Sequence, residues 1–168
     1  NHRSGLDIIP AALATDKPVR YMAKKDLFER GLIKKLCESM EVIPVSRDGN
    51  DVRAVMHALK ALKNGEIVAI YPEGTRNKTE ETFLPFKSGA TTLSIKTHSP
   101  IIPVVHVRKM RLFKRAHVIY GEPLEFTEFY DKKLTEEDIK HCDEILRNKM
   151  YELYEELLQI LTKKKKAK

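Results

Sequence analysis

The sequence has no uninterrupted apolar run approaching the roughly 18 residues needed to cross a bilayer, and it has no secretory signal peptide. It begins with Asn1 instead of Met. We therefore expect a segment upstream of Asn1. For this reason, the lack of a membrane-spanning run in these residues does not exclude membrane attachment. The 168 residues also lack internal repeats, and they fit one domain of ordinary size.

Cysteine is scarce and forms no motif. Only Cys37 and Cys142 are present, and neither belongs to a Cys-x-x-Cys pair or to a Cys/His zinc pattern. Two isolated thiols indicate a reducing, intracellular environment rather than a disulfide scaffold. Five of the six histidines also lack the spacing of metal ligands: His57, His98, His106, His117 and His141. We predict structural or surface roles for these five, and no metal site.

The charge is unbalanced toward the basic side, with 31 Lys and Arg against 24 Asp and Glu. A basic chain fits an anionic partner, either phospholipid headgroups or nucleic acid. The sequence has no nucleic-acid-binding motif and no basic ribbon interleaved with aromatic residues, so nucleic acid is not expected. We predict one folded domain over residues 1–162 and a basic tail over residues 163–168, for which a merely solubilising role stays open.

Helical and strand patterns alternate along the chain. Helices are predicted over residues 4–15, 26–40, 52–63, 88–97 and 135–161, and strands over residues 19–23, 41–45, 67–71, 101–107 and 116–120. Short apolar strands that alternate with helices predict an α/β fold, in which helices flank a mainly parallel or mixed sheet.

Two of these helices are clearly amphipathic. The helix capped by Asp51 has an apolar stripe formed by Val52, Val55, Met56, Leu59 and Leu62. The final helix begins with a capping box from Thr135 to Asp138. Its apolar stripe is longer and consists of Ile139, Cys142, Leu146, Met150, Leu153, Leu157 and Leu161. Because its opposite face is charged, we predict that this long C-terminal helix packs on the domain by one side.

His2 and Asp7 form the first candidate catalytic pair, within Asn1-His2-Arg3-Ser4-Gly5-Leu6-Asp7. One turn of chain can bring the carboxylate to the imidazole. A carboxylate on Nδ1 fixes the tautomer and leaves Nε2 as a base near neutral pH. The same spacing also fits a His and an Asp that only make local hydrogen bonds at a helix start, so spacing alone leaves both interpretations open.

Further candidates follow predicted strands, because sites in parallel sheets form at the carboxyl ends of strands. In Glu73-Gly74-Thr75-Arg76, Gly74 lets the backbone approach a ligand, and Arg76 offers a planar fork of donors that matches phosphate oxygens. The alternative for this segment is a strand-ending turn with a surface ion pair. Arg47 follows another predicted strand, whereas Ile102 to Val105 alone indicates only a buried strand.

Together these four segments resemble, in order, the four sequence blocks of the glycerolipid acyltransferases, typified by 1-acylglycerol-3-phosphate acyltransferase. Residues 1–7 match the pattern NHxSxxD, and residues 73–76 match EGTR. Arg47 matches the Arg of the second block, and residues 102–105 match the apolar fourth block. The resemblance extends from residue 1 to about residue 125 and implies a glycerol-3-phosphate acyltransferase-like fold.

The resemblance implies an O-acyltransferase of phospholipid biosynthesis. His2, oriented by Asp7, would take the proton from the free sn-2 hydroxyl of lysophosphatidic acid, which would attack a fatty-acyl thioester and give phosphatidic acid. The residues implied to bind the acceptor phosphate, or to order the loop around it, are Lys24, Arg47, Glu73, Gly74, Thr75 and Arg76. Lys25 could replace Lys24, because the two are adjacent. No cofactor is implied beyond the co-substrate, acyl-CoA or acyl carrier protein, because a thioester is already activated.

A lysophospholipid acceptor implies a membrane surface as a partner. The expected location is the cytoplasmic face of the cell membrane, reached peripherally or through the segment upstream of Asn1. One stretch departs from the family pattern: Phe28-Glu29-Arg30-Gly31 stands where the family often has an apolar stretch with Pro before a Gly. The departure leaves the channel for the acyl chain unassigned.

Three alternatives stay open. A covalent mechanism could use Ser4, which is close to His2, or Cys37, which has no assigned base. The acceptor could instead be glycerol-3-phosphate or a lysophospholipid with a headgroup. A non-catalytic module could use the basic charge to bind a membrane or nucleic acid.

Overall fold

The computed structural model describes the chain except for residues 30, 47–50, 108, 112–113 and 167–168. The chain divides into two compact units. The first unit consists of Asn1–Asp7 and Tyr71–Lys168, and the second consists of Ile8–Ile70. Both units combine strands with helices, which confirms the predicted α/β class.

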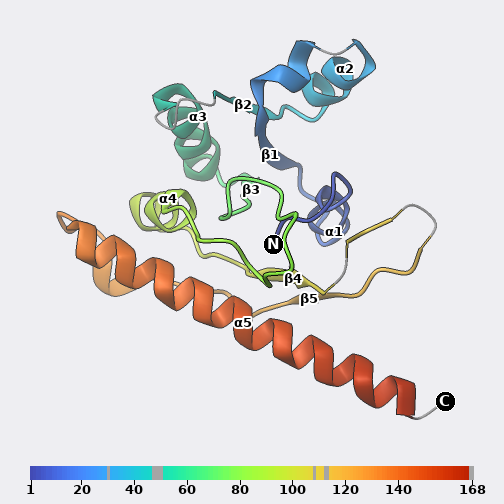
Figure 1. Cartoon of the computed structure of the whole chain (residues 1–168). Coiled ribbons are helices and arrows are strands. Elements are labelled where there is room, and N and C mark those ends of the chain that lie inside the picture. The colour runs from blue at the N-terminus through green and yellow to red at the C-terminus, as the bar shows by residue number, and fades with distance from the viewer. Residues whose placement is uncertain (30, 47–50, 108, 112–113, 167–168) are drawn as a thin grey trace. The chain divides into compact units, whose positions relative to one another are not determined.

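The second unit contains a three-stranded parallel sheet in the order β2-β1-β3 (Figure 1). Its strands are β1 (Val19–Lys24), β2 (Ile43–Val45) and β3 (Ile67–Ala69). The carboxyl-terminal half of β1 pairs with β2, and its amino-terminal half pairs with β3. β1 is therefore the central strand, and its Tyr21 side chain is buried and donates a hydrogen bond to the Ile8 carbonyl (2.6 Å).

Short helices surround these strands. They are α1 (Ile8–Leu13), the three-ten helix η1 (Lys25–Glu29), α2 (Gly31–Ser39) and α3 (Val52–Lys63). One continuous helix was predicted over residues 26–40, and this was wrong, because the structure forms η1 and α2 as separate elements. The low helix propensity of Gly31, the first residue of α2, disfavours one uninterrupted helix here.

The buried face of α3 is the face opposite to its large apolar residues. Asp51 caps the helix as predicted, because its side chain accepts the N–H of Ala54 (3.1 Å). The buried positions of α3 are Ala54, Ala58 and Ala61, whereas Val52 is 69% exposed and Met56 is 57% exposed. Small alanine side chains let a helix axis approach a sheet closely. The periodicity thus indicates the helix correctly but not the side that it buries.

The first unit contains a separate pair of strands, β4 (Val104–His106) and β5 (Val118–Tyr120). They are antiparallel, with Val104 opposite Tyr120 and His106 opposite Val118. The sheet composition is therefore mixed. The prediction of a fully buried strand over residues 101–107 was wrong in extent, because the strand is shorter and Ile102 is 56% exposed.

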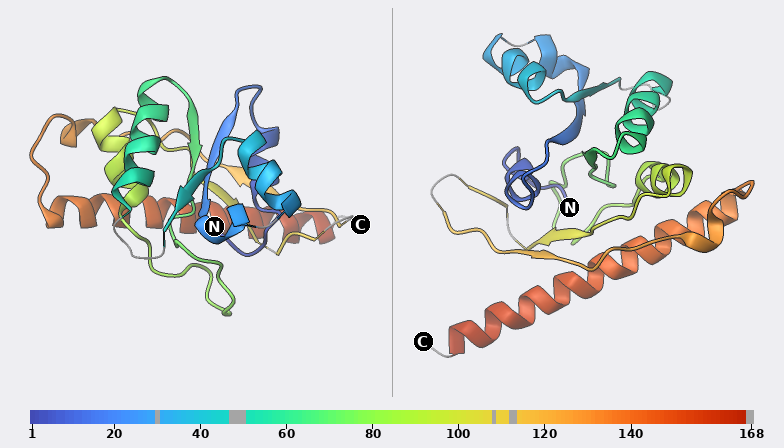
Figure 2. Two further views of the ribbon diagram at one scale, coloured as in Figure 1. Left: turned by 90° about the horizontal axis from the view of Figure 1, so that it is seen from above. Right: turned by 180° about the vertical axis from the view of Figure 1, so that it is seen from behind.

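The long helix α5 (Glu136–Lys166) packs across β4, β5 and α4 (Gly89–Thr97), as Figure 2 shows. Its predicted capping box is confirmed: the Asp138 N–H donates to Thr135 Oγ1 (3.1 Å), and Asp138 Oδ2 accepts the Thr135 N–H (2.8 Å). Its predicted stripe is also confirmed, with five buried residues: Cys142, Leu146, Met150, Leu153 and Leu157. Three of them form one core with Phe83 and Val105. No helix in the described ranges combines the length and the apolar character that a membrane span requires.

Candidate active site

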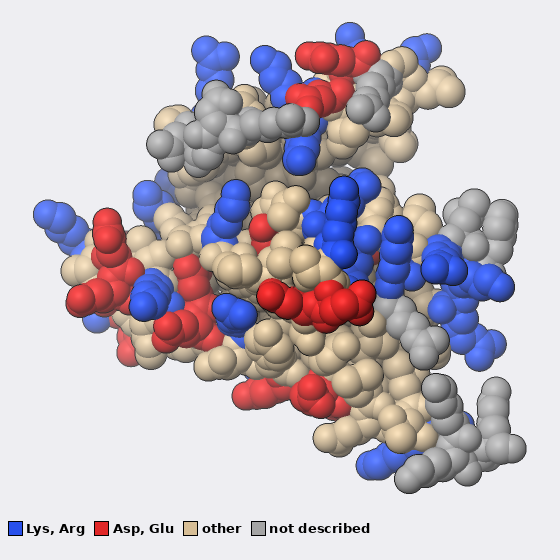
Figure 3. All heavy atoms as spheres, viewed as in Figure 1, with Lys and Arg blue, Asp and Glu red and all other residues tan. Residues whose placement is uncertain are grey.

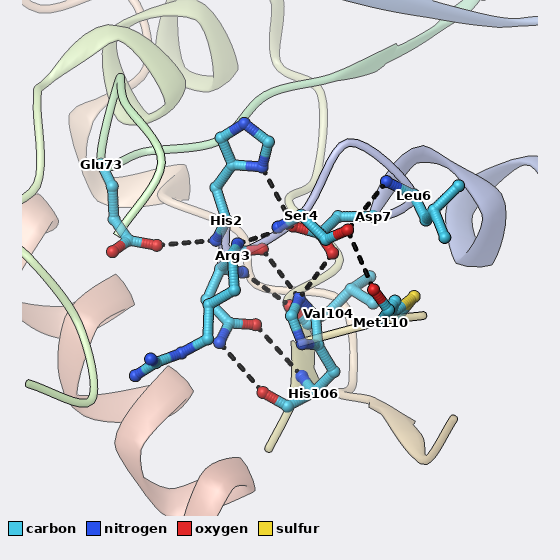
Figure 4. A network of polar contacts seen from close by, with 10 residues as sticks. His2, Arg3, Ser4, Leu6, Asp7, Glu73, Val104, His106 and Met110 are labelled. Atoms are coloured by element: carbon cyan, nitrogen blue, oxygen red, sulfur yellow. Dashed lines mark hydrogen bonds and ion pairs between the residues drawn. The ribbon is translucent and has the colours of Figure 1, made fainter. Parts of the chain in front are cut away.

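His2 and Asp7 contact each other in the first unit, with His2 Nδ1 3.0 Å from Asp7 Oδ2 (Figure 4). The same carboxylate oxygen accepts the backbone N–H groups of Arg3 and Ser4, each at 2.6 Å. These two bonds fold residues 2–7 into a tight loop, so α1 begins at Ile8 and not at Ser4 as predicted. The Asp7 side chain is 1% exposed and the His2 side chain is 18% exposed. The carboxylate therefore orients a ring that still reaches the surface.

Asp7 is ionised at neutral pH. Burial would raise the pKa of its carboxyl, but the nearby His106 ring and hydrogen bonds from His2 and the Ser4 backbone together lower that pKa far below its ordinary range. An ionised carboxylate only accepts hydrogen bonds, so the neutral His2 ring carries its proton on Nδ1. The lone pair is then on Nε2, which lies on the side of the ring away from Asp7 (Figure 4).

His106 is a second imidazole at Asp7, and sequence reasoning did not find it. Its Nε2 lies 3.4 Å from Asp7 Oδ1 and 3.2 Å from the Asn1 carbonyl oxygen. The Asn1 side chain in turn bridges the His106 backbone, since Nδ2 donates to the carbonyl (3.0 Å) and Oδ1 accepts the N–H (3.1 Å). The one available signal was a titratable residue in the apolar stretch from Ile101 to Val107.

The segment from Tyr71 to Asn77 packs directly against His2. The Tyr71 ring stacks on the imidazole, with ring centroids 4.1 Å apart. Glu73 is only 2% exposed; its Oε1 accepts the His2 N–H (2.8 Å) and its Oε2 accepts the Leu84 N–H (3.0 Å). The Asn77 N–H donates to the His2 carbonyl (2.7 Å). Both carboxylate oxygens of Glu73 thus accept hydrogen bonds from backbone N–H groups.

Gly74, Thr75 and Arg76 are exposed beside the same loop. Gly74 has a φ of +63°, which favours glycine, and a Cβ at this position would lie 2.8 Å from Lys87 Cδ. A Cβ at Gly5 would lie 3.2 Å from Arg76 Nη2, so the guanidinium is next to the loop that holds His2 and Asp7. Lys87 is therefore a further cation near this loop, and sequence reasoning did not single it out.

Neither candidate nucleophile is activated. The Ser4 hydroxyl donates to the Met110 carbonyl (3.0 Å) and accepts the Leu6 N–H (3.2 Å), so its hydrogen bonds are local and structural. Cys37 is buried in α2, in the second unit. Burial and the nearby Glu38 carboxylate raise the pKa of its thiol, which disfavours the thiolate that a nucleophile needs.

The remaining predicted site residues belong to the second unit. Lys24 is the exposed last residue of β1 and pairs with Val45, the last residue of β2. Arg47 lies outside the described residues. The structure thus gathers His2, Asp7 and the segment from Glu73 to Arg76 in one unit. Within the described ranges, no group of three His, Cys, Asp or Glu side chains could hold a metal ion.

Comparison with known proteins is consistent with this arrangement. A family model described as Acyltransferase matches residues 1–107. The 1-acyl-sn-glycerol-3-phosphate acyltransferase of Bacillus subtilis (strain 168) is 30% identical over 165 residues, which cover 95% of this chain and 81% of that protein. The Helicobacter pylori (strain J99) protein of the same name is 33% identical over 117 residues, 67% of this chain and 48% of that protein.

The fold agrees with a solved structure, the 1-acyl-sn-glycerophosphate (LPA) acyltransferase PlsC from Thermotoga maritima. The TM-score is 0.65 at 24% identity, over 91% of this chain and 64% of that chain. Fold, sequence blocks and family match together define an enzyme that transfers acyl groups. The chain belongs to the acyltransferase family, as an O-acyltransferase, which confirms the resemblance carried by residues 1–7 and 73–76.

Proposed function

We propose that this chain transfers a fatty-acyl group from a thioester to the free sn-2 hydroxyl of lysophosphatidic acid and so forms phosphatidic acid. The observation that carries the proposal is the 3.0 Å contact between His2 Nδ1 and Asp7 Oδ2, next to the Arg76 guanidinium. The names of the relatives from Bacillus subtilis and Helicobacter pylori support this choice of acceptor.

In the proposed reaction, His2 acts as the general base. Its Nε2 takes the hydroxyl proton while the acceptor oxygen bonds to the carbonyl carbon of the thioester. The carbon–sulfur bond then breaks, and the leaving thiolate takes the proton from the imidazolium and departs as a thiol. Asp7 stabilises the imidazolium across the 3.0 Å contact. A positioned base of this kind contributes about 10²- to 10⁴-fold to a rate.

In this proposal, basic side chains bind the phosphate of the acceptor. Arg76 offers two parallel donors for phosphate oxygens, and Lys87 adds a charge beside Gly74. We include Lys24 and Arg47 among the proposed phosphate ligands, as well as Thr75 and the Gly74 backbone. Glu73 orders the loop through its bonds to His2 and Leu84.

The donor is an acyl thioester on coenzyme A or acyl carrier protein, and the reaction as proposed uses no further cofactor because the thioester is already activated. The acceptor is a membrane lipid, so we propose that the enzyme works at the cytoplasmic face of the cell membrane. Direct attack is proposed over an acyl-enzyme, because the Ser4 hydroxyl is used in local hydrogen bonds and the Cys37 thiol has a raised pKa.

The test measures transfer of labelled acyl groups to lysophosphatidate, glycerol-3-phosphate and lysophosphatidylcholine. Lysophosphatidate is expected to be the preferred acceptor, and His2→Ala to lower turnover by at least about 10²-fold. His57→Ala, at an exposed position of α3, is the matched control and should retain activity. Preference for another acceptor, or activity that survives His2→Ala, would contradict the proposal. A trapped acyl group that is lost in Ser4→Ala would overturn direct attack.

A further inference from the structure

Two stretches of the sequence are especially dense in cations and contain no acidic residue. Residues 107–121 include five Lys or Arg and no Asp or Glu, and residues 157–168 include five Lys and no Asp or Glu. All 24 acidic residues lie outside these two stretches. These two stretches therefore differ from an ordinary solvated surface, on which both signs alternate.

The fold brings residues 116–119 of the first stretch next to α5, within the first unit. A shallow groove of about 250 Å³ lies between them. Residues 116–119, which lead into β5 and include its first two residues, form one wall, and Leu157, Ile160, Leu161 and Lys164 of α5 form the other. Ile160 is 37% exposed although it is a large apolar residue. The groove thus combines apolar side chains with a cation at its edge.

The two stretches carry six exposed cations, of which Lys164 lines the groove itself: Lys109, Arg111, Lys114, Arg115, Lys163 and Lys164. We call them, together with the groove, the basic groove surface. Within the described part of the chain, no salt bridge involves these six side chains. In Figure 3, Lys and Arg side chains gather on the side where Figure 1 draws the segment between β4 and β5. Their charge is therefore available to an anionic partner.

This surface is joined to the candidate active site by one contact. Met110 lies between Lys109 and Arg111, and its carbonyl accepts the Ser4 hydroxyl (3.0 Å) in the loop that holds His2 and Asp7. A partner bound on the basic groove surface would consequently lie on the segment that anchors the catalytic loop.

We propose that the basic groove surface docks the enzyme on an anionic phospholipid bilayer; the choice of a lipid partner rests on the proposed lipid acceptor. The cations contact the headgroups, and Ile160 and Leu161 contact the apolar region beneath them. Nucleic acid offers phosphates but nothing apolar of this kind for the groove, so a bilayer matches both features. Each Lys or Arg near an anionic membrane strengthens binding about five-fold, roughly 1 kcal/mol.

The test is cosedimentation of the whole protein with vesicles of phosphatidylcholine containing phosphatidylglycerol, compared with phosphatidylcholine alone. The triple variant Lys114→Glu, Arg115→Glu, Lys164→Glu is expected to bind the anionic vesicles about 100-fold more weakly. The matched control is Lys132→Glu, Lys133→Glu, Lys140→Glu, at exposed positions next to or in the first turns of α5, with the same change of net charge. The control is expected to lose less than about five-fold.

A further variant, Ile160→Gln, keeps the charge and is expected to weaken binding by about five-fold, because the proposal places this side chain in the apolar region of the bilayer. Equal losses in both triple variants would overturn the proposal, because binding would then follow net charge alone. Tighter binding to duplex DNA or to acyl carrier protein than to anionic vesicles would also overturn it. Turnover of a short-chain, water-soluble lysophosphatidate is measured in parallel: its absence in the unmodified protein would refute the proposed reaction and leave the vesicle result standing.

Discussion

The buried imidazole of His106 lies 3.4 Å from Asp7 Oδ1, while His2 binds the other carboxylate oxygen at 3.0 Å. Asp7 is thus held from two sides. Because the His106 Nε2 also lies 3.2 Å from the Asn1 carbonyl, which only accepts hydrogen bonds, this nitrogen carries a proton. That N–H points to the Asn1 carbonyl, and the ring is close enough to the carboxylate to contribute to the lowered pKa of Asp7. For the proposed reaction, we therefore expect His106 to be a positioning residue that acts on His2 through Asp7.

We expect His106→Ala to lower kcat by about ten-fold and to change the KM for the acceptor by less than two-fold, because the variant loosens Asp7 and not the phosphate ligands. His106→Gln keeps an N–H donor and is expected to restore most of kcat. Steady-state kinetics on both variants measure this split. His141→Ala, at an exposed position of α5, is the control. A matching loss in His106→Gln, or a change confined to KM, would argue against positioning.

Gly74 provides a second prediction, because its backbone conformation and its surroundings both exclude a side chain. At a φ of +63°, an alanine is strained by about 1–2 kcal/mol, and its Cβ would meet Lys87 Cδ at 2.8 Å. We expect Gly74→Ala to displace Lys87 or the loop before Arg76 and to raise the acceptor KM about ten-fold. Gly89→Ala, in α4 with open space around the Cβ position, is the control and should leave the KM unchanged.

The lowered pKa of Asp7 predicts how stability depends on pH. Since folding lowers this pKa, the ionised carboxylate stabilises the folded state above its ordinary pKa near 4. This stabilisation is lost progressively as the pH falls below about 4 toward the folded-state pKa. Urea denaturation from about pH 6 to pH 3 is expected to show a steeper loss of stability for the unmodified protein than for Asp7→Asn. Parallel curves would mean that Asp7 does not titrate in this way.

The orientation of α3 supplies a stability prediction with opposite outcomes on its two faces. Met56 is exposed and Ala58 is fully buried. We therefore expect Met56→Ser to change the free energy of unfolding by less than about 0.5 kcal/mol, and Ala58→Leu to destabilise by roughly 1–3 kcal/mol through overpacking. Chemical denaturation measures both changes. A large effect of Met56→Ser with no effect of Ala58→Leu would show that the helix buries its large side chains instead.

The sequence predicts those parts of the fold that depend on neighbouring residues. The capping box at Thr135 and Asp138 and the buried stripe of α5 are local patterns, and the structure confirms both. The family was predicted because two of its blocks are short and unbroken in the sequence. α3 was harder, because helical periodicity gives two apolar faces there, one of alanines and one of large residues, and only the neighbouring strands decide which is buried.

The sequence predicts which types of residue form the candidate site, but it does not predict which distant residues contact one another there. His2 and Asp7 are close in sequence, so one turn of chain suggests their contact. His106 reaches Asp7 across 99 positions, and no local pattern indicates such a pairing. Lys87 is close to Gly74 only because of the turn that the segment makes between them.

The contacts that anchor the His–Asp loop join the two ends of a long stretch of chain. Asn1 bonds to the backbone of His106, and the Ser4 hydroxyl bonds to the Met110 carbonyl, over 105 and 106 positions. On the ribosome, the loop emerges first and its anchoring carbonyls emerge several seconds later, at roughly 5–20 residues per second. A stalled or prematurely terminated product that ends before Val104 therefore contains the sequence motif, but it lacks the residues that hold the loop of His2 and Asp7 in place.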